Sequence, residues 1–371
     1  MRLSASGTAC AVARGVAVRN DVAGTKVARA IGLHYVVEGE PGLTRVRRGK
    51  TFAYRDAKGR AVRDARTLDR IRSLVIPPAW KHVWISARAD GHVQATGRDA
   101  RGRKQHRYHP DWTAARHESK YGQMIDFARA LPAIRKRVHA DLKTAALSRP
   151  HMLATVVLLL EKTLIRIGNK EYARANKSFG LTTLLDQHVQ IKGASVTFHF
   201  RAKSGVMQTI EVHDPAVARI LKRCRQLPGE ALFQYVDDNG KRQSIDSTAV
   251  NAYLRDVTGR SSFTAKNFRT WAATVLAAKA VCDLPECTSD AAFKRNIVRA
   301  IDAVAAKLGN TRAVCRSSYI HPGVFEGYRA GATIAGVKAG PRMAHLSADE
   351  AAVLAMLKSR ARHNRREKVA A

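Results

Sequence analysis

The sequence predicts an α+β fold in which a small, mainly β domain precedes a larger, mainly α domain that carries a small antiparallel β-meander. Short strand-like runs bounded by turn residues dominate up to about residue 112, and helical periodicity dominates after it. Three strand-like runs interrupt the helical part between residues 188 and 212. We therefore expect a disordered extension over 1–30, domains over 31–112 and 113–335, and a C-terminal helix with a basic tail over 336–371.

The N-terminal domain is predicted from its turns. Asp56–Gly59, Ala89–Gly91 and Asp99–Gly102 each lie between two strand-like runs, as expected for hairpins. Ile76-Pro-Pro-Ala-Trp80 predicts a rigid extended segment, because proline disfavours helical backbone in the residue before it. Thr67–Leu74 has the pattern of a single helix.

A basic hairpin is predicted around the third turn. Gly97–Lys104 has the glycine spacing of a phosphate-binding P-loop but lacks the Gly-Lys-Ser/Thr ending, so we reject nucleotide binding. We interpret the segment as a hairpin that lies along a phosphate backbone, and the alternative is an exposed loop that is basic only because the whole chain is basic. The candidate nucleic-acid contacts are Arg98, Arg101, Arg103, Lys104, Gln105, His106 and Tyr108.

The larger domain contains a helix that is apolar on nearly all sides. The pattern predicts a helix over Met152–Ile167 that stops at Gly168, which places Arg166 on its last turn. A guanidinium in such an apolar setting requires a partner, since an unpaired buried charge is very costly. That partner is either a carboxylate of the protein or a bound phosphate gripped by the planar fork.

The β-meander is predicted over His188–Ile191, Ser195–Arg201 and Val206–Val212. Lys203 lies at the tip of its second hairpin. A lysine at a tip is usually just solvated, but it can also carry an ammonium group to a substrate as a proton donor.

Two more helices follow. Asp246–Gly259 is predicted as a capped helix, and Arg269 lies among aromatic residues near the start of a helix that runs to about Ala280. Near the C-terminus we expect a helix over Ala348–Leu357 and then a disordered basic run, Arg360–Lys368, attracted to nucleic acid without specificity.

The stretch Lys307–Pro322 contains the candidate nucleophile. A helix runs into it, and its apolar face repeats at Phe293, Ile297, Ile301, Val304 and Leu308. Gly309 is expected to cap this helix, which leaves Asn310 and Tyr319 just beyond the helix end, on exposed backbone with arginines nearby. A phenol has a pKa of about 10, so Tyr319 attacks well only where fixed positive charge stabilises the phenolate.

The composition favours a polyanionic partner. The 371 residues include 65 Lys and Arg against 30 Asp and Glu, a net charge of +35 that is spread along the chain. Nucleic acid is the default partner for such a chain, and a solvated basic surface is the alternative. We expect no membrane association, because no run approaches the roughly 18 apolar residues of a bilayer span.

The cysteines predict neither disulfides nor a metal centre. The five are irregularly spaced and form no Cys-x-x-Cys pair, which indicates reduced thiols in a cytoplasm-like compartment. A site built on Cys282, Cys287 and a distant histidine is the alternative. The first 30 residues are similar in composition to a transit peptide, but a disordered extension or an upstream start codon is the interpretation that we prefer.

Several ordered motifs resemble those of type IB DNA topoisomerases, in particular their compact bacterial and poxvirus-like branch. The motifs of the larger domain are Leu164-Ile-Arg-Ile-Gly-Asn169, Ser178-Phe-Gly-Leu-Thr-Thr183, Lys203-Ser-Gly205, Phe263–Trp271, Leu308-Gly-Asn310 and Tyr319-Ile-His-Pro322. Ile76–Trp80 and Gln94–Gln105 resemble the N-terminal domain of that branch, and the likeness runs from about Gly32 to Tyr328. It implies a fold like that of tyrosine recombinases and type IB topoisomerases.

The resemblance also implies roles for five residues. Tyr319 would attack a DNA phosphodiester and form a 3′-phosphotyrosyl link, Arg166 and Arg269 would hold the non-bridging oxygens, and Lys203 would protonate the departing 5′-oxygen. Asn310 stands where many relatives carry histidine and would donate a hydrogen bond to phosphate. Two further departures are Asn267, where Asp is expected before Phe-Arg, and His106, where Tyr is usual.

The expected activity is relaxation of supercoiled duplex DNA by strand cleavage, rotation and religation, with no ATP, metal or other cofactor. We expect a cytoplasmic, nucleoid-associated monomer that clamps double-stranded DNA between its two domains. One alternative is a tyrosine recombinase, although Lys266 stands where that family has the histidine of a His-x-x-Arg box. The other is a non-enzymatic basic DNA-packaging protein, which would leave the arginines in apolar settings unexplained.

Overall fold

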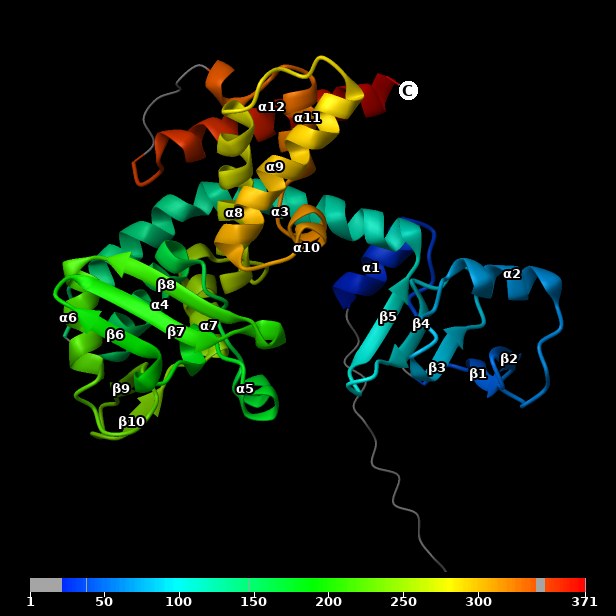
Figure 1. Ribbon diagram of the computed structural model, residues 1–371, viewed down its shortest axis with the longest axis horizontal. Helices are drawn as coiled ribbons and strands as arrows, with labels where there is room; N and C mark the ends of the chain where they lie inside the picture. Colours follow the sequence, from blue (N-terminus) through cyan, green and yellow to red (C-terminus); the bar gives the residue numbers. More distant parts are fainter. Residues whose placement is uncertain (1–21, 38, 146, 338–343, 371) are drawn as a thin grey trace, which may run out of the picture. The chain divides into compact units, whose positions relative to one another are not determined.

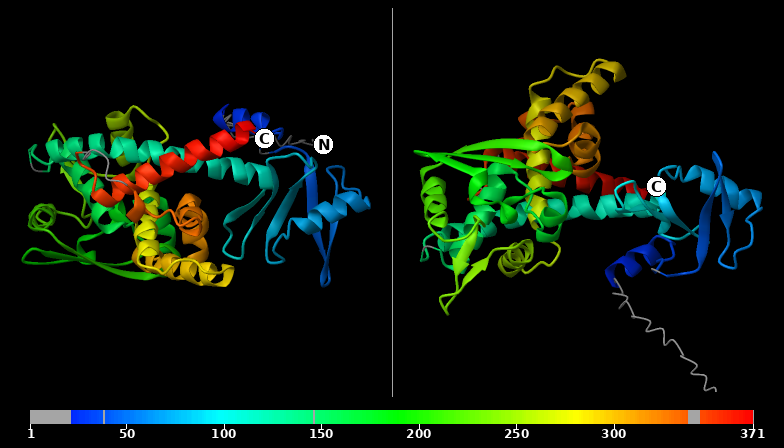
Figure 2. Two further views of the ribbon diagram at one scale, coloured as in Figure 1. Left: turned by 90° about the horizontal axis from the view of Figure 1, so that it is seen from above. Right: turned by 60° about the horizontal axis from the view of Figure 1, so that its bottom comes forward.

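The computed structural model describes residues 22–37, 39–145, 147–337 and 344–370, and the described chain forms two compact units that divide between Lys120 and Tyr121. Figure 1 and Figure 2 show an antiparallel sheet in the first unit and a mainly helical second unit. The mixed α and β architecture predicted from the sequence is confirmed at this level. The predicted domain limits at residues 112 and 335 stay a prediction.

The first unit is built on one five-stranded antiparallel sheet. Its spatial order is β2 (Thr51–Arg55), β1 (Gly42–Arg48), β3 (Lys81–Ser86), β4 (Val93–Arg98) and β5 (Lys104–Tyr108). Helix α2 (Ala65–Ser73) buries Ile71 with Leu43, Val83 and Ile85 of the sheet. Strand β1 was not predicted, because four of its seven residues are arginine or threonine and only the first two are buried.

The glycine spacing that imitates a P-loop has a structural cause. A Cβ on Gly97 would lie 2.8 Å from Trp80 Cε3, so the strand needs glycine where this indole packs on it. Gly102 closes the β4–β5 turn with a φ of +73°. The carbonyls of Pro77 and Trp80 accept hydrogen bonds from Arg45 at 3.1 and 2.6 Å, which fixes the proline segment against β1.

A helix lies within the segment predicted to be a disordered extension. Helix α1 (Val22–Ala30) buries Ala28 completely, against Leu33 and Trp112. That part of the prediction is wrong. The basic, alanine-rich composition of the segment gave no clear apolar pattern from which its short buried helix face could be predicted. Residues 1–21 lie outside the described chain.

Helices form most of the second unit. They are α3 (Pro110–Asp141, which begins in the first unit), α4 (Arg149–Thr163), α5 (Lys170–Asn176), α6 (Pro215–Cys224), α7 (Ser247–Thr258), α8 (Ala265–Cys282), α9 (Asp290–Leu308), α10 (Arg312–Ser318), α11 (Pro322–Arg329) and α12 (Ala348–Ala370). Helix α8 packs against α4, α7, α9, α11 and α12, so it is the central element of the core. None of the helices in the described part of the chain has the length and apolar character that crossing a bilayer requires.

The predicted meander is confirmed. Strands β6 (Val189–Lys192), β7 (Ser195–Arg201) and β8 (Met207–His213) form an antiparallel sheet in sequence order. Phe198 and Phe200 of β7 are buried and attach this sheet to the helical core. A two-stranded sheet, β9 (Gln234–Val236) with β10 (Arg242–Ser244), was not predicted because each strand has only three residues.

Helix α4 ends earlier than its apolar pattern predicts. Its last residue is Thr163, and Leu164 takes a left-handed conformation with a φ of 54°. Arg166 therefore lies in a segment without regular secondary structure rather than on a helical turn. The Arg166 carbonyl accepts a hydrogen bond from the Leu181 amide at 2.8 Å, and a Cβ on Gly180 would lie 2.4 Å from this carbonyl oxygen. Gly180 thus lets the two segments approach closely and fixes the backbone at Arg166.

Helix α12 is anchored to the core through Glu350. This carboxylate accepts hydrogen bonds from Arg135 of α3, at 2.7 and 2.8 Å, and from Trp271 Nε1 of α8 at 3.0 Å. Arg135 also pairs with Glu161 of α4, so the ion network joins four helices. The helix continues to Ala370, so the predicted helix end at Leu357 and the disordered basic tail are wrong for the backbone.

We expect Glu350→Gln to lower the free energy of unfolding by about 3 kcal/mol, because it leaves the buried side of Arg135 without a full counter-charge. Burial raises the pKa of Glu350, but hydrogen bonds from Arg135, Ser347 and Trp271 and the Arg135 charge outweigh it and lower the pKa overall. A lowered folded-state pKa stabilises the fold above the unfolded value of about 4.3. The difference between variant and wild type should therefore shrink as the pH falls through the folded pKa.

Urea unfolding monitored by circular dichroism at pH 7 and at a series of pH values below 4 measures this effect. Asp349→Ala is the matched control, since the neighbouring Asp349 pairs with Lys279 on the surface and its loss should change the midpoint far less. Equal midpoints for Glu350→Gln and wild type at pH 7 would contradict the role given to the network.

Candidate active site

The end of helix α9 places Asn310. Gly309 caps the helix with a φ of 59°, as its sequence predicts, and the Asn310 amide donates to the Ala305 carbonyl at 3.1 Å. Asn310 Oδ1 accepts a hydrogen bond from Arg166 Nη2, which joins residues 144 positions apart in the chain. Asn310 Nδ2 is buried and has no acceptor among the described residues.

Arg269 lies on the second turn of α8, with only 4% of its surface exposed. Its Nη2 donates to the Leu308 carbonyl at 2.9 Å, and its buried Nε has no acceptor in the described chain. Burial and then the neighbouring charge of Arg166 lower the pKa of the Arg269 guanidinium. Two guanidiniums and an amide thus converge at the end of α9.

Tyr319 follows directly after the short helix α10, and 9% of its surface is exposed. The Arg269 Cζ atom lies 5.4 Å from the centroid of its ring. Thr274 of α8 holds the backbone, because its hydroxyl lies 3.3 Å from the Tyr319 carbonyl oxygen and accepts from the His321 amide at 3.1 Å. Helix α8 therefore positions both Arg269 and the backbone of Tyr319.

The electrostatics around Tyr319 favour the phenolate. Burial raises the pKa of the Tyr319 hydroxyl. The charges of Arg269 and Arg166, a hydrogen bond from Arg269 and the charge of Lys266 lower it by more than burial raises it. The net pKa of Tyr319 is below that of an ordinary tyrosine. This is the direction that a nucleophilic phenol requires.

The surroundings of Tyr319 differ from the sequence prediction in one respect. The phenol was expected on exposed backbone, whereas α10 turns the chain back so that Tyr319 packs in the core. Of the two arginines that lie near Tyr319 in the sequence, Arg312 pairs with Asp302 of α9 and Arg316 is exposed.

Lys203 lies outside this cluster. It occupies a tight turn, Lys203–Gly205, between β7 and β8 and is exposed. The hairpin reaches the cluster through Gln208 of β8, whose amide nitrogen would lie 1.9 Å from a Cβ added to Gly309. The structure thus brings Tyr319, Arg166, Arg269 and Asn310 together and leaves Lys203 on an adjoining hairpin.

The predicted nucleic-acid contacts lie on both faces of the β4–β5 hairpin. Lys104, His106 and Tyr108 are exposed on one face of β5, and the rings of His106 and Tyr108 stack with their centroids 5.6 Å apart. Gln105 points to the other face, where it donates to Asp99 at 2.9 Å. A hydrogen bond from Arg103 is the main cause that lowers the pKa of Asp99 to about 2, so this carboxylate stays charged and organises the turn with Arg101 and Arg103.

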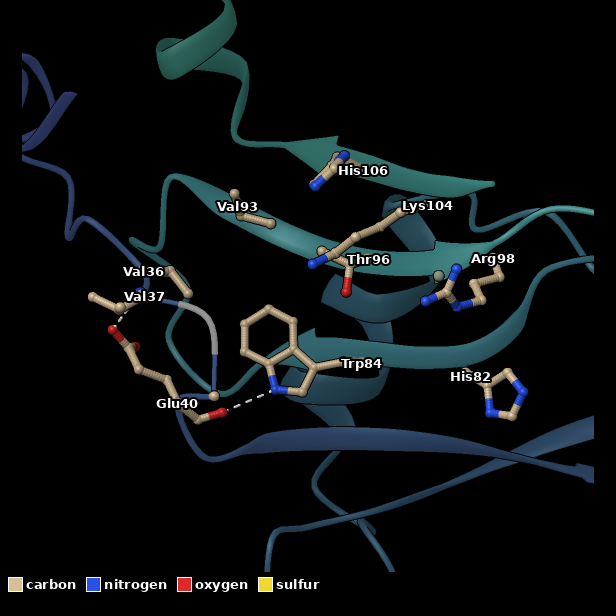
Figure 3. Close-up of a pocket in the computed structure, with 12 residues that line it drawn as sticks. Val36, Val37, Glu40, His82, Trp84, Val93, Thr96, Arg98, Lys104 and His106 are labelled. Carbon is tan, nitrogen blue, oxygen red and sulfur yellow. Dashed lines mark hydrogen bonds between the residues drawn. The ribbon is translucent and has the colours of Figure 1, made fainter. Parts of the chain in front are cut away.

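A pocket of about 540 Å³ adjoins the exposed face of β5. Figure 3 shows Lys104, His106 and Arg98 around it, with the Trp84 indole on its floor. Trp84 Nε1 donates to the Glu40 carbonyl at 3.1 Å, which fixes the ring. Cationic groups around an apolar, aromatic floor suit an anionic, base-bearing polymer.

The described residues contain no group of three or more His, Cys, Asp and Glu side chains that could hold a metal ion. The cysteines that the structure describes, Cys224, Cys282, Cys287 and Cys315, are free thiols. Cys10 lies outside the described residues.

Sequence reasoning missed two residues beside the cluster as site residues. Lys266 precedes Arg269 by three positions on α8, and its charge contributes to the lowered pKa of Tyr319. The helical i, i+3 spacing was the available signal. Gln208 gave no signal, because its contact with Gly309 joins a strand and a helix end that are 101 positions apart.

A buried phenol beside two guanidiniums, with Arg269 Nε and Asn310 Nδ2 left without acceptors among the described residues, has the chemistry expected for nucleophilic attack on a phosphate ester. Comparisons with known proteins agree. Residues 109–336 match the family model described as the catalytic core of eukaryotic DNA topoisomerase I, and residues 51–99 match the N-terminal domain of bacterial DNA topoisomerase IB. The chain therefore belongs to the DNA topoisomerase I family, as a compact type IB enzyme.

Viral relatives cover most of both chains. DNA topoisomerase 1B of Acanthamoeba polyphaga mimivirus is 29% identical over 286 residues, which span 75% of this chain and 85% of the relative. DNA topoisomerase I of Monkeypox virus and DNA topoisomerase 1B of Vaccinia virus (strain Copenhagen) are each 22% identical over 235 residues, which span 62% of this chain and 70% of the relative.

Proposed function

We propose that the chain relaxes supercoiled duplex DNA through a covalent link to Tyr319. The Tyr319 hydroxyl loses its proton to water, its oxygen attacks a backbone phosphorus, a Tyr–O–P bond forms, and the bond from phosphorus to the 5′-oxygen breaks. The strand then carries a 3′-phosphotyrosyl end and a free 5′-hydroxyl. The observation that carries this proposal is the convergence on one buried phenol of Arg166, Arg269 and Asn310, with donors that have no acceptor among the described residues.

The two guanidiniums and the amide have distinct tasks. Negative charge builds on the non-bridging oxygens in the transition state, and preorganised donors stabilise it without reorganising. Arg269 Nε and Asn310 Nδ2 are buried donors of this cluster without an acceptor among the described residues. Arg166 supplies a second charge, and its hydrogen bond to Asn310 Oδ1 turns the amide so that Nδ2 faces the phosphate.

The leaving 5′-oxygen needs a proton, since an alkoxide is a poor leaving group. Lys203 is the proposed donor, because its ammonium is exposed on a hairpin that contacts the corner beside Asn310. The same lysine, then neutral, can accept the proton of the 5′-hydroxyl during religation.

Exchange of one phosphodiester for another conserves the bond energy, so the proposed reaction needs neither ATP nor another cofactor. While the strand is open, the duplex rotates about the intact strand and supercoils relax. We propose that the enzyme acts as a monomer whose two domains clamp the duplex. Arg98, Arg101, Arg103, Lys104, Gln105, His106 and Tyr108 are the proposed contacts of the N-terminal hairpin.

Supercoiled plasmid incubated with the protein, EDTA and no ATP tests the proposal. We expect ladders of partly relaxed topoisomers, also on a plasmid without any recombination site, which separates this activity from that of a recombinase. Denaturation with SDS during the reaction should trap the protein on a 5′-labelled strand, as a 3′-phosphotyrosyl link requires. Adducts only with 3′-labelled strands, or relaxation that depends on metal, would contradict the proposed chemistry.

Asn310→Ala should slow single-turnover cleavage by about 10- to 100-fold, because a hydrogen bond to a charged group such as phosphate contributes on the order of 1.5–3 kcal/mol. Asn310→His is the matched variant, since histidine restores a donor at the same position. We expect it to cleave within about threefold of wild type. A rate for Asn310→Ala equal to that of wild type would remove Asn310 from the site.

A further inference from the structure

The β7–β8 hairpin holds Lys203 in a defined relation to the strands below it. The turn is tight, with Ser204 and Gly205 at φ values of 68° and 79°, and the Ala202 amide donates to the Val206 carbonyl at 2.7 Å. Directly below, Gln208 of β8 pairs with Phe200 of β7, whose ring is 1% exposed. The position of β8 therefore determines where the turn places the lysine.

The outermost part of this hairpin is not packed into the protein. Val206 and Met207 are 52% and 54% exposed, high values for apolar side chains. Side chains of β8 alternate between faces, and Gln208 lies on the face that continues to buried Val212. Gln208 is thus the inward-facing residue of β8 nearest the turn.

Gln208 contacts the end of helix α9 at Gly309, where the absence of a side chain leaves room for its amide. A Cβ on Gly309 would lie 1.9 Å from Gln208 Nε2 and 3.2 Å from its Cδ, so the amide rests on the bare α-carbon of this glycine. Gly309 immediately precedes Asn310, and its φ of 59° is the helix cap that directs Asn310 toward Arg166. The Gln208 side chain therefore links the hairpin that carries Lys203 to Asn310, the residue proposed to bind the phosphate.

We infer that Gln208 is a positioning residue for Lys203, which sets the distance between the lysine hairpin and the phosphate-binding corner at Gly309–Asn310. The inference rests on the proposed function of this site, in which Lys203 protonates the 5′-oxygen. Gln208 touches no reacting atom. Loss of its amide lets the hairpin shift, and a shift of about 1 Å in a catalytic group is sufficient to reduce a rate up to 100-fold.

A substrate whose leaving group needs no proton tests this inference. In duplex DNA with sulfur in place of the bridging 5′-oxygen at the cleavage site, the leaving group is a thiolate, whose conjugate acid has a pKa of about 8.5, as for cysteine. We expect Gln208→Ala to slow single-turnover cleavage of ordinary DNA by about 10- to 100-fold and to cleave the sulfur-containing DNA within about twofold of wild type. Lys203→Ala should show the same pattern, and the double variant should be no slower than Lys203→Ala.

Gln190→Ala is the matched control, because Gln190 is an exposed residue of β6 in the same sheet. It should cleave both substrates at the wild-type rate, and urea midpoints should confirm that both glutamine variants are folded. Equal slowing of Gln208→Ala on both substrates, or no slowing on either, would overturn the inference. If wild type itself forms no adduct, the proposed function fails, whereas rescue of Lys203→Ala but not of Gln208→Ala by sulfur would leave the function intact and reject only the role of Gln208.

Discussion

Tyr319→Phe is expected to form no covalent adduct with DNA and to relax no supercoiled plasmid, while it binds duplex DNA within about twofold of wild type. The substitution removes only the hydroxyl oxygen that would bond to phosphorus. The remaining ring still fills its place in the core and still lies under the Arg269 guanidinium. The net charge of +35, which supplies the electrostatic part of DNA binding, is unchanged.

Two assays separate binding from chemistry in this variant. Filter binding measures affinity for a duplex, and trapping with SDS on a 5′-labelled strand measures the adduct. Tyr253→Phe is the matched control, since Tyr253 is also buried in the second unit and its hydroxyl donates to Asp141 at 2.8 Å. The control should lose some stability but keep its adduct and its relaxation. Any relaxation by Tyr319→Phe would show that another group attacks the phosphate.

The parts of the site that sequence could predict are those set by local signals. Gly309 follows an apolar helical repeat, and the structure has a left-handed cap at that residue. Arg166 and Arg269 stand among apolar residues in the sequence, and a charge in such a setting requires a partner. The three strands of the meander alternate regularly, so their limits were predicted to within one or two residues.

The parts that could not be predicted depend on contacts between distant segments. The apolar pattern of α4 continues past Thr163, but the chain leaves the helix at Leu164 because the Arg166 and Ile167 carbonyls bond to Leu181 and Thr182. The docking of the first turn of α12 on the core depends on hydrogen bonds from Arg135 and Trp271 to Glu350. No local pattern in the chain encodes either contact.

The same limit applies to the acidity of Tyr319. Sequence alone indicated that positive charge must surround the phenol, but not which charges do. Burial and the arginines act in opposite directions on its pKa, and only the geometry shows that Arg269 and Arg166 together outweigh burial. This balance makes the contribution of Arg269 measurable as a change in pH dependence, separately from its contribution to the rate.

Arg269→Ala should slow single-turnover cleavage at pH 7.5 by about 10²- to 10³-fold, the typical cost of removing one preorganised donor to a developing anion. It should also move the pH profile. In wild type the rate should rise as Tyr319 ionises and level off above its lowered pKa. Without the Arg269 charge, burial should raise the pKa of Tyr319, which would move the plateau to higher pH. Arg316→Ala, which removes an exposed arginine of α10, should leave both rate and profile unchanged at saturating DNA. A slow Arg269→Ala variant with an unshifted profile would show that Arg269 holds the phosphate without tuning the nucleophile.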